Sequence, residues 1–180
     1  MAGKLISAID IKKLWYCETA DITAAVTGAT LKTLLATAKE VTNIHQDTWQ
    51  VEEAEPSQDS YRNQLTGSIY RQGRKTMGDV TVTFTIGQYD FELKQELMGG
   101  KATEGVWERG RGPVYIHKGI IALTTDDVYI VYPYCNISVR EAATDGALGL
   151  SVTATVMEPK TETISTEYWV DAEQVKADEV

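Results

Sequence analysis

The chain has 180 residues, 43% of them hydrophobic, two cysteines and a formal net charge of −9 at pH 7. This length suits a single domain over residues 1–180 that buries a core without disulfides, and we expect Cys17 and Cys135 to be reduced. The acidic balance argues against tight DNA or RNA binding, because that affinity comes largely from Lys and Arg. No run of about 18 apolar residues predicts a membrane span, so we expect a protein made in the cytoplasm.

The first quarter of the chain predicts one helix and one strand. After an apolar stretch over residues 5–16, Leu31, Leu34, Leu35 and Ala38 lie at helical spacing within residues 21–43. Residues 48–53 predict a strand with Trp49 and Val51 on one face, which ends before Pro56.

Residues 57–78 form a long polar segment with three glycines and a basic group. A loop of about twenty residues without structure is uncommon in a compact domain. We interpret the segment as a long, protruding β-hairpin that contacts another chain, because it has no low-complexity tract and is basic within an acidic protein. The candidate contact residues are Tyr61, Arg62, Tyr70, Arg71, Arg74 and Lys75.

Residues 78–100 predict a strand followed by a helix. Apolar residues alternate with threonines over residues 80–86, which puts Val80, Val82, Phe84 and Ile86 on a buried face and leaves an outward row of Thr81, Thr83 and Thr85. Tyr89, Leu93 and Leu97 then recur at four-residue spacing, typical of a helix. Gly99 and Gly100 follow at the position of a left-handed cap.

The remainder reads as closely spaced strands. A glycine-rich connection over residues 101–113 precedes strands at 114–123, 128–134 and 136–140, the last being a separate strand or the far side of a bulge at Pro133. The strand 148–156 would point Leu148, Leu150, Val152, Ala154 and Val156 inward. Residues 158–180 are expected to form an acidic C-terminal arm that includes Asp178 and Glu179.

The fold class that follows is mainly β (α+β). It is an antiparallel β-sandwich or barrel with one or two packed α-helices and a long protruding hairpin. Two helices are too few to cover a parallel sheet.

The sequence has no pattern typical of catalysis or cofactor binding. His45 and His117 lie at no metal-ligand spacing, and Asp126 and Asp127 are explained by a turn. We therefore expect no enzyme activity, no metal and no cofactor. An aromatic set could line a sugar-binding face, although such residues ordinarily pack sheets; it comprises Trp107, Tyr115, Tyr129, Tyr132 and Tyr134.

The order of these segments resembles the tail-tube proteins of long-tailed phages and, more distantly, the tube proteins of type VI secretion. The resemblance rests on TWQVEEAEPSQDSY, NQLTGSIYRQGRKTMG, GDVTVTFTIGQYDFELKQELMGG, Trp107 and the strand 148–156. It implies a virion structural protein of a phage or prophage. Homohexameric rings with a shared inner sheet would stack into a conduit for DNA, with the basic segment at the stacking contact and the threonine row toward the lumen.

The implied partners are further copies of the chain, other tail proteins and DNA in transit, and the implied location is the tail of the virion. Two alternatives remain open. One is a monomeric β-sandwich module that binds carbohydrate or peptide, and the other is a capsid decoration or neck protein.

Overall fold

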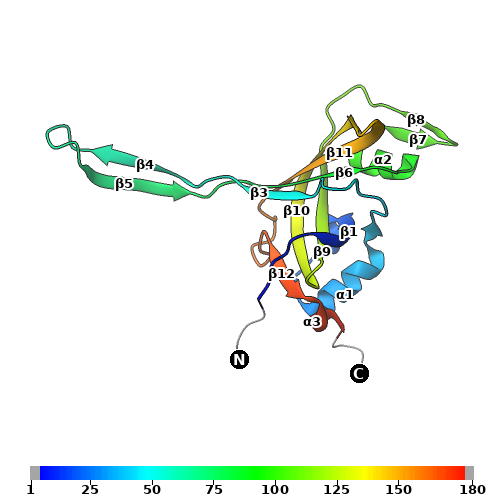
Figure 1. The fold of residues 1–180 in the computed structure, drawn as a ribbon, viewed down its shortest axis with the longest axis horizontal. Coiled ribbons are helices and arrows are strands. Elements are labelled where there is room, and N and C mark those ends of the chain that lie inside the picture. The colour runs from blue at the N-terminus through cyan, green and yellow to red at the C-terminus, as the bar shows by residue number, and fades with distance from the viewer. Residues whose placement is uncertain (1–4, 177–180) are drawn as a thin grey trace.

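A computed structural model describes residues 5–176 of the chain (Figure 1). One large antiparallel sheet dominates the body, short helices pack on it, and a two-stranded ribbon projects far to one side. The predicted class, mainly β with packed helices and a long hairpin, is confirmed. No helix within residues 5–176 is long and apolar enough to cross a membrane.

The helices are α1 (Gly28–Thr37), α2 (Phe91–Met98) and α3 (Ala172–Lys176), with a short 3-10 turn η1 (Thr19–Asp21). The strands are β1 (Ile11–Glu18), β2 (Lys39–Glu40), β3 (Gln50–Glu53), β4 (Ser57–Arg62), β5 (Ile69–Thr76), β6 (Val80–Ile86), β7 (Lys101–Thr103), β8 (Val106–Glu108), β9 (Ile116–Thr124), β10 (Val128–Thr144), β11 (Ala147–Val156) and β12 (Tyr168–Asp171).

The large sheet has the order β2-β1-β9-β10-β11-β6-β3, and β12 pairs with the beginning of β10. The long strand β10 therefore joins every part of the sheet. Its register shifts between Tyr132 and Cys135, around Pro133. This β-bulge adds one residue, so Tyr132 and Cys135 both face the same core despite their odd spacing. Of the two predicted alternatives, the bulge is correct.

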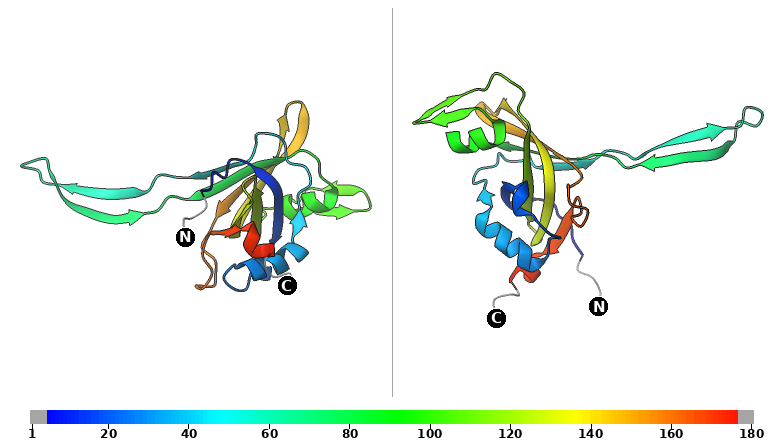
Figure 2. Two further views of the ribbon diagram at one scale, coloured as in Figure 1. Left: turned by 60° about the horizontal axis from the view of Figure 1, so that its bottom comes forward. Right: turned by 180° about the vertical axis from the view of Figure 1, so that it is seen from behind.

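The part of the sheet formed by β1, β9 and the beginning of β10 is buried on both faces, which explains the uninterrupted apolar runs in these strands. Leu14 and Tyr16 belong to one core cluster, the α2-side core, which contains Leu97 of α2. Trp15 and Cys17 point the other way into the α1-side core, with residues of α1 and α3. Figure 2 shows these helices around the sheet from two further directions.

The two predicted helices form, each with a defined start. The Thr27 side chain accepts a hydrogen bond from the backbone N–H of Thr30 in a capping box at α1, and the Asp90 carboxylate accepts one from the N–H of Leu93 at α2. Gly99 and Gly100 follow α2 with φ values of 80° and 86°, so the predicted glycine stop is confirmed.

Two expectations about local structure need correction. Residues 101–113 are more than a connection, because β7 and β8 pair as a small hairpin around Glu104 and Gly105, both at positive φ. Leu148 does not point inward: it is 59% exposed at the tip of the β10–β11 hairpin.

The C-terminal segment is not a free arm as far as it is described. β12 pairs with β10, and Ile164 and Val175 are buried in the α1-side core. Of the acidic residues assigned to this segment, Asp178 and Glu179 lie outside the described residues.

Candidate assembly surface: the projecting arm and the polar wall

Within residues 5–176, strands β4 and β5 pair only with each other, in a two-stranded sheet separate from the main one. We call residues 57–76 the arm. The predicted protruding hairpin is confirmed: the arm extends away from the body in every view (Figures 1 and 2). All its residues are exposed except Gly73, which is half-buried, so the arm adds nothing to either core.

The tip of the arm is a closed loop held by its own hydrogen bonds. The N–H groups of Gly67 and Leu65 donate to the backbone oxygen and the side-chain oxygen of Asn63, each at 2.8 Å. Arg62 donates to the carbonyl of Gly67 at 3.1 Å. Leu65, 93% exposed, lies at this tip, so an apolar side chain is presented at the far end of the arm.

At the base of the arm, two backbone segments lie in close contact. The N–H of Ala54 donates to the carbonyl of Asp79 at 3.0 Å. A Cβ atom at Gly78 would lie 1.6 Å from the carbonyl oxygen of Ala54, so only glycine fits there. This contact fixes where the ribbon leaves the β3–β6 pair.

The six predicted contact residues all lie on the arm. Tyr61 stands opposite Arg71, whose guanidinium lies 5.9 Å from the centre of the Tyr61 ring. Tyr70 is exposed, and Arg62 is engaged with the tip loop. Arg71, Arg74 and Lys75 form no ion pair with any residue in the described part of the chain.

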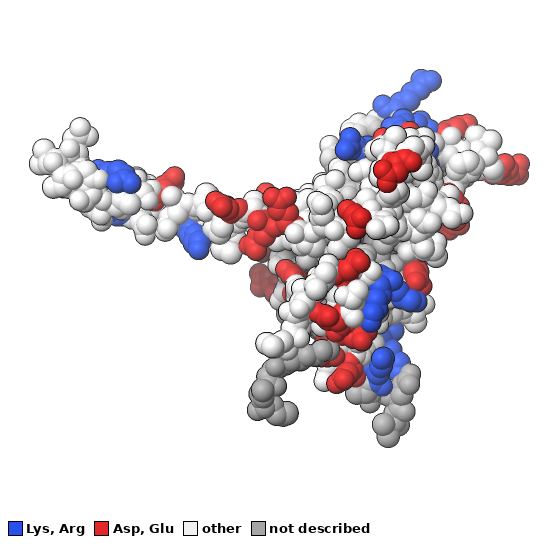
Figure 3. Space-filling model, in the orientation of Figure 1, with Lys and Arg blue, Asp and Glu red and all other residues white. Residues whose placement is uncertain are grey.

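Charge is divided between the arm and the body. The arm carries four basic residues and one acidic residue, so its net charge is +3. Because the whole chain has a net charge of −9, the rest of the chain carries −12. Figure 3 shows basic side chains along the ribbon and acidic ones where it meets the body. The acidic residues of that segment are Glu52, Glu53, Glu55 and Asp79.

An isolated two-stranded ribbon is only marginally stable in water, and both of its edges carry unpaired backbone groups. The arm also exposes Tyr61, Ile69 and Tyr70. These properties suit a segment that binds to another surface.

The threonine row lies on the face of the sheet opposite the α2-side core. Each threonine has a hydroxyl-bearing partner on β11, since Thr81 pairs with Thr155, Thr83 with Thr153 and Thr85 with Ser151. The strands on either side of this pair, β3 and β10, extend this polar wall with Gln50, Glu52, Asn136, Ser138 and Arg140.

Only part of the threonine row is open. Thr81 and Thr83 are half-buried, but Thr85 is 8% exposed, which corrects the expectation that all three face open space. The Thr85 methyl group packs over Gly149, where an added Cβ would lie 2.9 Å away. The accessible part of the polar wall therefore includes Thr81 and Thr83 but not Thr85.

Models of known protein families gave no match to this sequence, and a search of curated proteins gave none.

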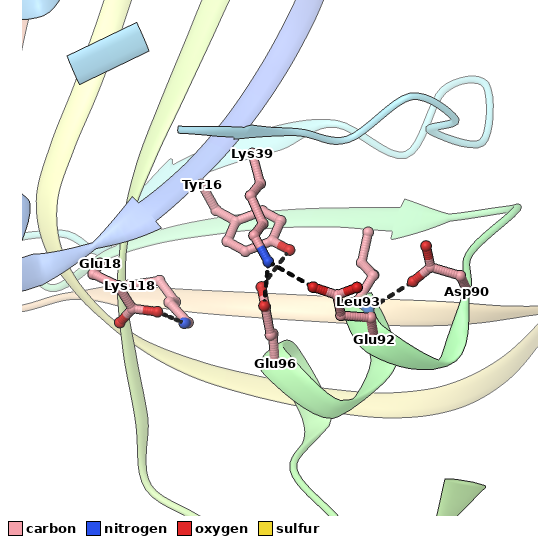
Figure 4. Close-up of polar contacts among 8 residues, drawn as sticks. All are labelled: Tyr16, Glu18, Lys39, Asp90, Glu92, Leu93, Glu96 and Lys118. Carbon is pink, nitrogen blue, oxygen red and sulfur yellow. Dashed lines mark hydrogen bonds and ion pairs between the residues drawn. The ribbon is translucent and has the colours of Figure 1, made fainter. Parts of the chain in front are cut away.

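A polar cluster that the sequence did not reveal fixes α2 to β1 and β2 (Figure 4). The Tyr16 hydroxyl donates to Glu96 at 2.8 Å, and Lys39 bonds both Glu96 and Glu92. Burial and the hydrogen bond to Glu96 raise the pKa of Tyr16. Burial opposes ionisation of Glu96, but bonds from Lys39 and Tyr16 outweigh it, so the Glu96 pKa is lowered. The cluster is an anchor of the fold.

A second cluster joins α2 to the β7–β8 hairpin and to β10. The ammonium of the buried Lys94 pairs with Glu141 and lies 4.0 Å from the centre of the Trp107 ring. Arg109 also bonds Glu141, at 3.0 Å, and lies 5.6 Å from the same ring. The hydrogen bond from Lys94 lowers the pKa of Glu141. Two cations therefore lie close to the Trp107 ring.

The aromatic residues considered for a sugar platform do not share a face. Trp107 is engaged as described, Tyr132 is fully buried in the α2-side core, and Tyr129 packs against Trp15 with ring centres 6.2 Å apart. His117 stacks on Tyr134 at 5.0 Å. Within residues 5–176, no group of three His, Cys, Asp or Glu side chains could hold a metal ion. Cys17 and Cys135 are free, and burial raises the pKa of each thiol to about 12.

Proposed function

We propose that this protein is a structural subunit of a phage tail tube, which assembles into rings that stack into a conduit for DNA. The observation that carries the proposal is the arm: a long, exposed, basic ribbon attached to a body whose cores are complete without it. The longer strand of the ribbon, β5, has eight residues and spans about 26 Å, at about 3.3 Å per residue. That length reaches well onto a neighbouring subunit.

The edges of the main sheet support ring formation. Within residues 5–176, β2 pairs only with β1 and β3 only with β6, so each of these edge strands keeps one side without a strand partner. Such edges are prone to pair with other chains. A head-to-tail ring joins one of these two edges of each subunit to the other edge of the next, so neither of the two stays open.

The polar wall suits the lining of a DNA conduit. Most residues of the wall carry hydroxyl or amide groups, and Arg140 is the one cation among them. Because affinity for nucleic acid comes largely from Lys and Arg, DNA would slide past this surface without being held. In this role the chain is not an enzyme and needs no cofactor; its partners are its own copies and other tail proteins within the virion.

Light scattering over a concentration series, with negative-stain images of the same fractions, tests the proposal. The full chain is expected to form rings or tubes. A variant in which a two-residue Asn-Gly turn replaces residues 57–76 should keep a cooperative thermal unfolding transition of the body and lose stacking. A full chain that stays monomeric at every concentration, and in the presence of preformed tail ends, would contradict the proposal.

One observation favours a second candidate, a module that binds carbohydrate or peptide. The stacked His117 and Tyr134 line a pocket of about 450 Å³ together with Lys160. Stacked rings beside a cation are a suitable platform for a sugar or an aromatic peptide side chain. This candidate predicts a monomer, and ligand-induced shifts of the His117 ring signals in NMR would support it.

A further inference from the structure

A groove of about 360 Å³ opens on the body beside the base of the arm. Trp49, Val51 and Glu53 line one side, because alternate residues of a strand share a face. Trp169 and Glu167, at the beginning of β12, line the other side, and Ile9 borders the groove. The floor includes Ile130 and Tyr132, so the groove is the place where the α2-side core reaches the surface.

The groove exposes large apolar side chains that the body leaves uncovered. Ile9 is 81% exposed, Trp169 50% and Val51 43%. Single apolar residues on a surface are ordinary, but several around one hollow indicate a binding site for a partner. The indole of Trp169 is also oriented, because its N–H donates to the Glu167 carboxylate.

The rim of the groove is acidic. Glu53 and Glu167 lie in its lining, and Glu55 follows two positions after Glu53. Glu53 forms no ion pair with the residues between positions 5 and 176. The groove therefore suits a partner that presents apolar or aromatic side chains together with positive charge.

The arm has this composition. It exposes Tyr61, Ile69 and Tyr70 beside Arg71, Arg74 and Lys75, which have no intramolecular ion pair within the described chain. A molecule cannot fill its own groove, because the contact of Gly78 with Ala54 directs the arm away from the body (Figure 1).

We propose that this groove receives the arm of a second copy of the chain. The aromatic side chains of the arm cover Trp169 and Val51, and its basic residues face Glu53 and Glu167. The inference rests on the proposed self-assembly and names the surface that it uses. Charge complementarity then sets the register of the contact.

Charge reversal with exchange of partners tests this pairing. One variant carries Arg71→Glu and Arg74→Glu on the arm, and the other carries Glu53→Lys and Glu167→Lys in the groove. Each variant alone places like charges together, so it should need about tenfold or more protein to assemble. An equimolar mixture should recover assembly, because each arm then meets a groove of opposite charge.

A matched control reverses two exposed acidic residues of the β7–β8 hairpin, Glu104→Lys and Glu108→Lys. This control changes the net charge by the same amount as the groove variant and should assemble like the unmodified chain. Circular dichroism of every variant verifies that the fold is retained.

Disulfide trapping gives an independent readout of the same contact. Tyr70→Cys in one chain and Val51→Cys in a differently tagged chain should form a mixed dimer under mild oxidation. Thr33→Cys, on the exposed side of α1, replaces Val51→Cys as the control. The native thiols are buried with pKa values of about 12, so they should not react.

The outcomes separate the two proposals. Tubes that form equally well with a reversed groove, together with no trapped dimer, would overturn the arm-in-groove contact and leave the tube proposal standing. A chain that neither assembles nor cross-links under any condition would overturn both. Trapping and rescue in the mixture would support the contact.

Discussion

The hydroxyl of Tyr16 on β1 donates a hydrogen bond to Glu96 on α2 at 2.8 Å, across 80 positions of sequence. Removing it in Tyr16→Phe leaves the buried ring in place and Glu96 with one donor fewer. We expect the free energy of unfolding to fall by about 1–2 kcal/mol, measured by urea denaturation at pH 7. An unchanged midpoint and slope would contradict this role for the hydroxyl.

The lowered pKa of Glu96 makes part of the stability dependent on pH. Its bonds to Lys39 and Tyr16 favour the charged form in the folded state. That contribution is fully present above the ordinary carboxyl pKa of 4.5 and is lost as the pH falls through the lower, folded-state pKa. In Glu96→Gln, stability should be lower at pH 7 and should decline less steeply below pH 4.5, as measured by thermal unfolding across the acid range. An equally steep decline would place the effect on other carboxylates.

Gly78 should not tolerate a side chain. In Gly78→Ala the new Cβ would lie 1.6 Å from the carbonyl oxygen of Ala54, so the base of the arm must shift. We expect a loss of about 1–3 kcal/mol in unfolding free energy, from steric strain. Gly110→Ala is the matched control, because no atom lies within 4 Å of its added Cβ. Equal stability of the two variants would mean that the close contact between Gly78 and Ala54 is absent in solution.

Truncating each of two leucines of β11, Leu148 and Leu150, should change the free energy of unfolding by very different amounts. Leu150 is fully buried, and Leu150→Ala should cost about 2–5 kcal/mol through the cavity it leaves. Leu148 is mostly exposed, so Leu148→Ala should change the unfolding free energy by less than about 0.5 kcal/mol. The reverse order in chemical denaturation would mean that the register of β11 is wrong.

The polar wall makes a similar prediction for two threonines of β6. Thr83 is half-buried among hydroxyl groups, so Thr83→Glu should fold and remain soluble. Thr85 is buried over Gly149, and Thr85→Glu would place a carboxylate there at a cost of several kcal/mol. Soluble yield and circular dichroism distinguish the two. Equal tolerance would show that Thr85 is open to solvent.

Local patterns in the sequence were sufficient for the parts of the fold that depend on them. The alternation from Val80 to Ile86, the helical spacing before Gly99 and the polar segment of the arm all have local causes. The double burial of the sheet was also visible in principle, because the run from Leu14 to Cys17 has no polar face to turn outward.

Contacts between distant segments were beyond such patterns. The acidic composition of residues 158–180 concealed β12, whose pairing with β10 depends on where the long strand passes. The small β7–β8 hairpin turns through Glu104 at positive φ, which a glutamate rarely adopts. Of the candidate surface, the basic residues of the arm were found from sequence; the groove was not, since its walls come from segments far apart in the chain.

The pairing of β12 with β10 has a consequence for the order in which the protein becomes competent to associate. During synthesis the arm leaves the ribosome long before Trp169, so a nascent chain carries the ribbon but has only one wall of the groove. Growing chains on the same messenger therefore present basic ribbons with no receiving site among them. Under the proposed contact, only a subunit that has added β12 to the sheet offers such a site, so association would have to wait for folding.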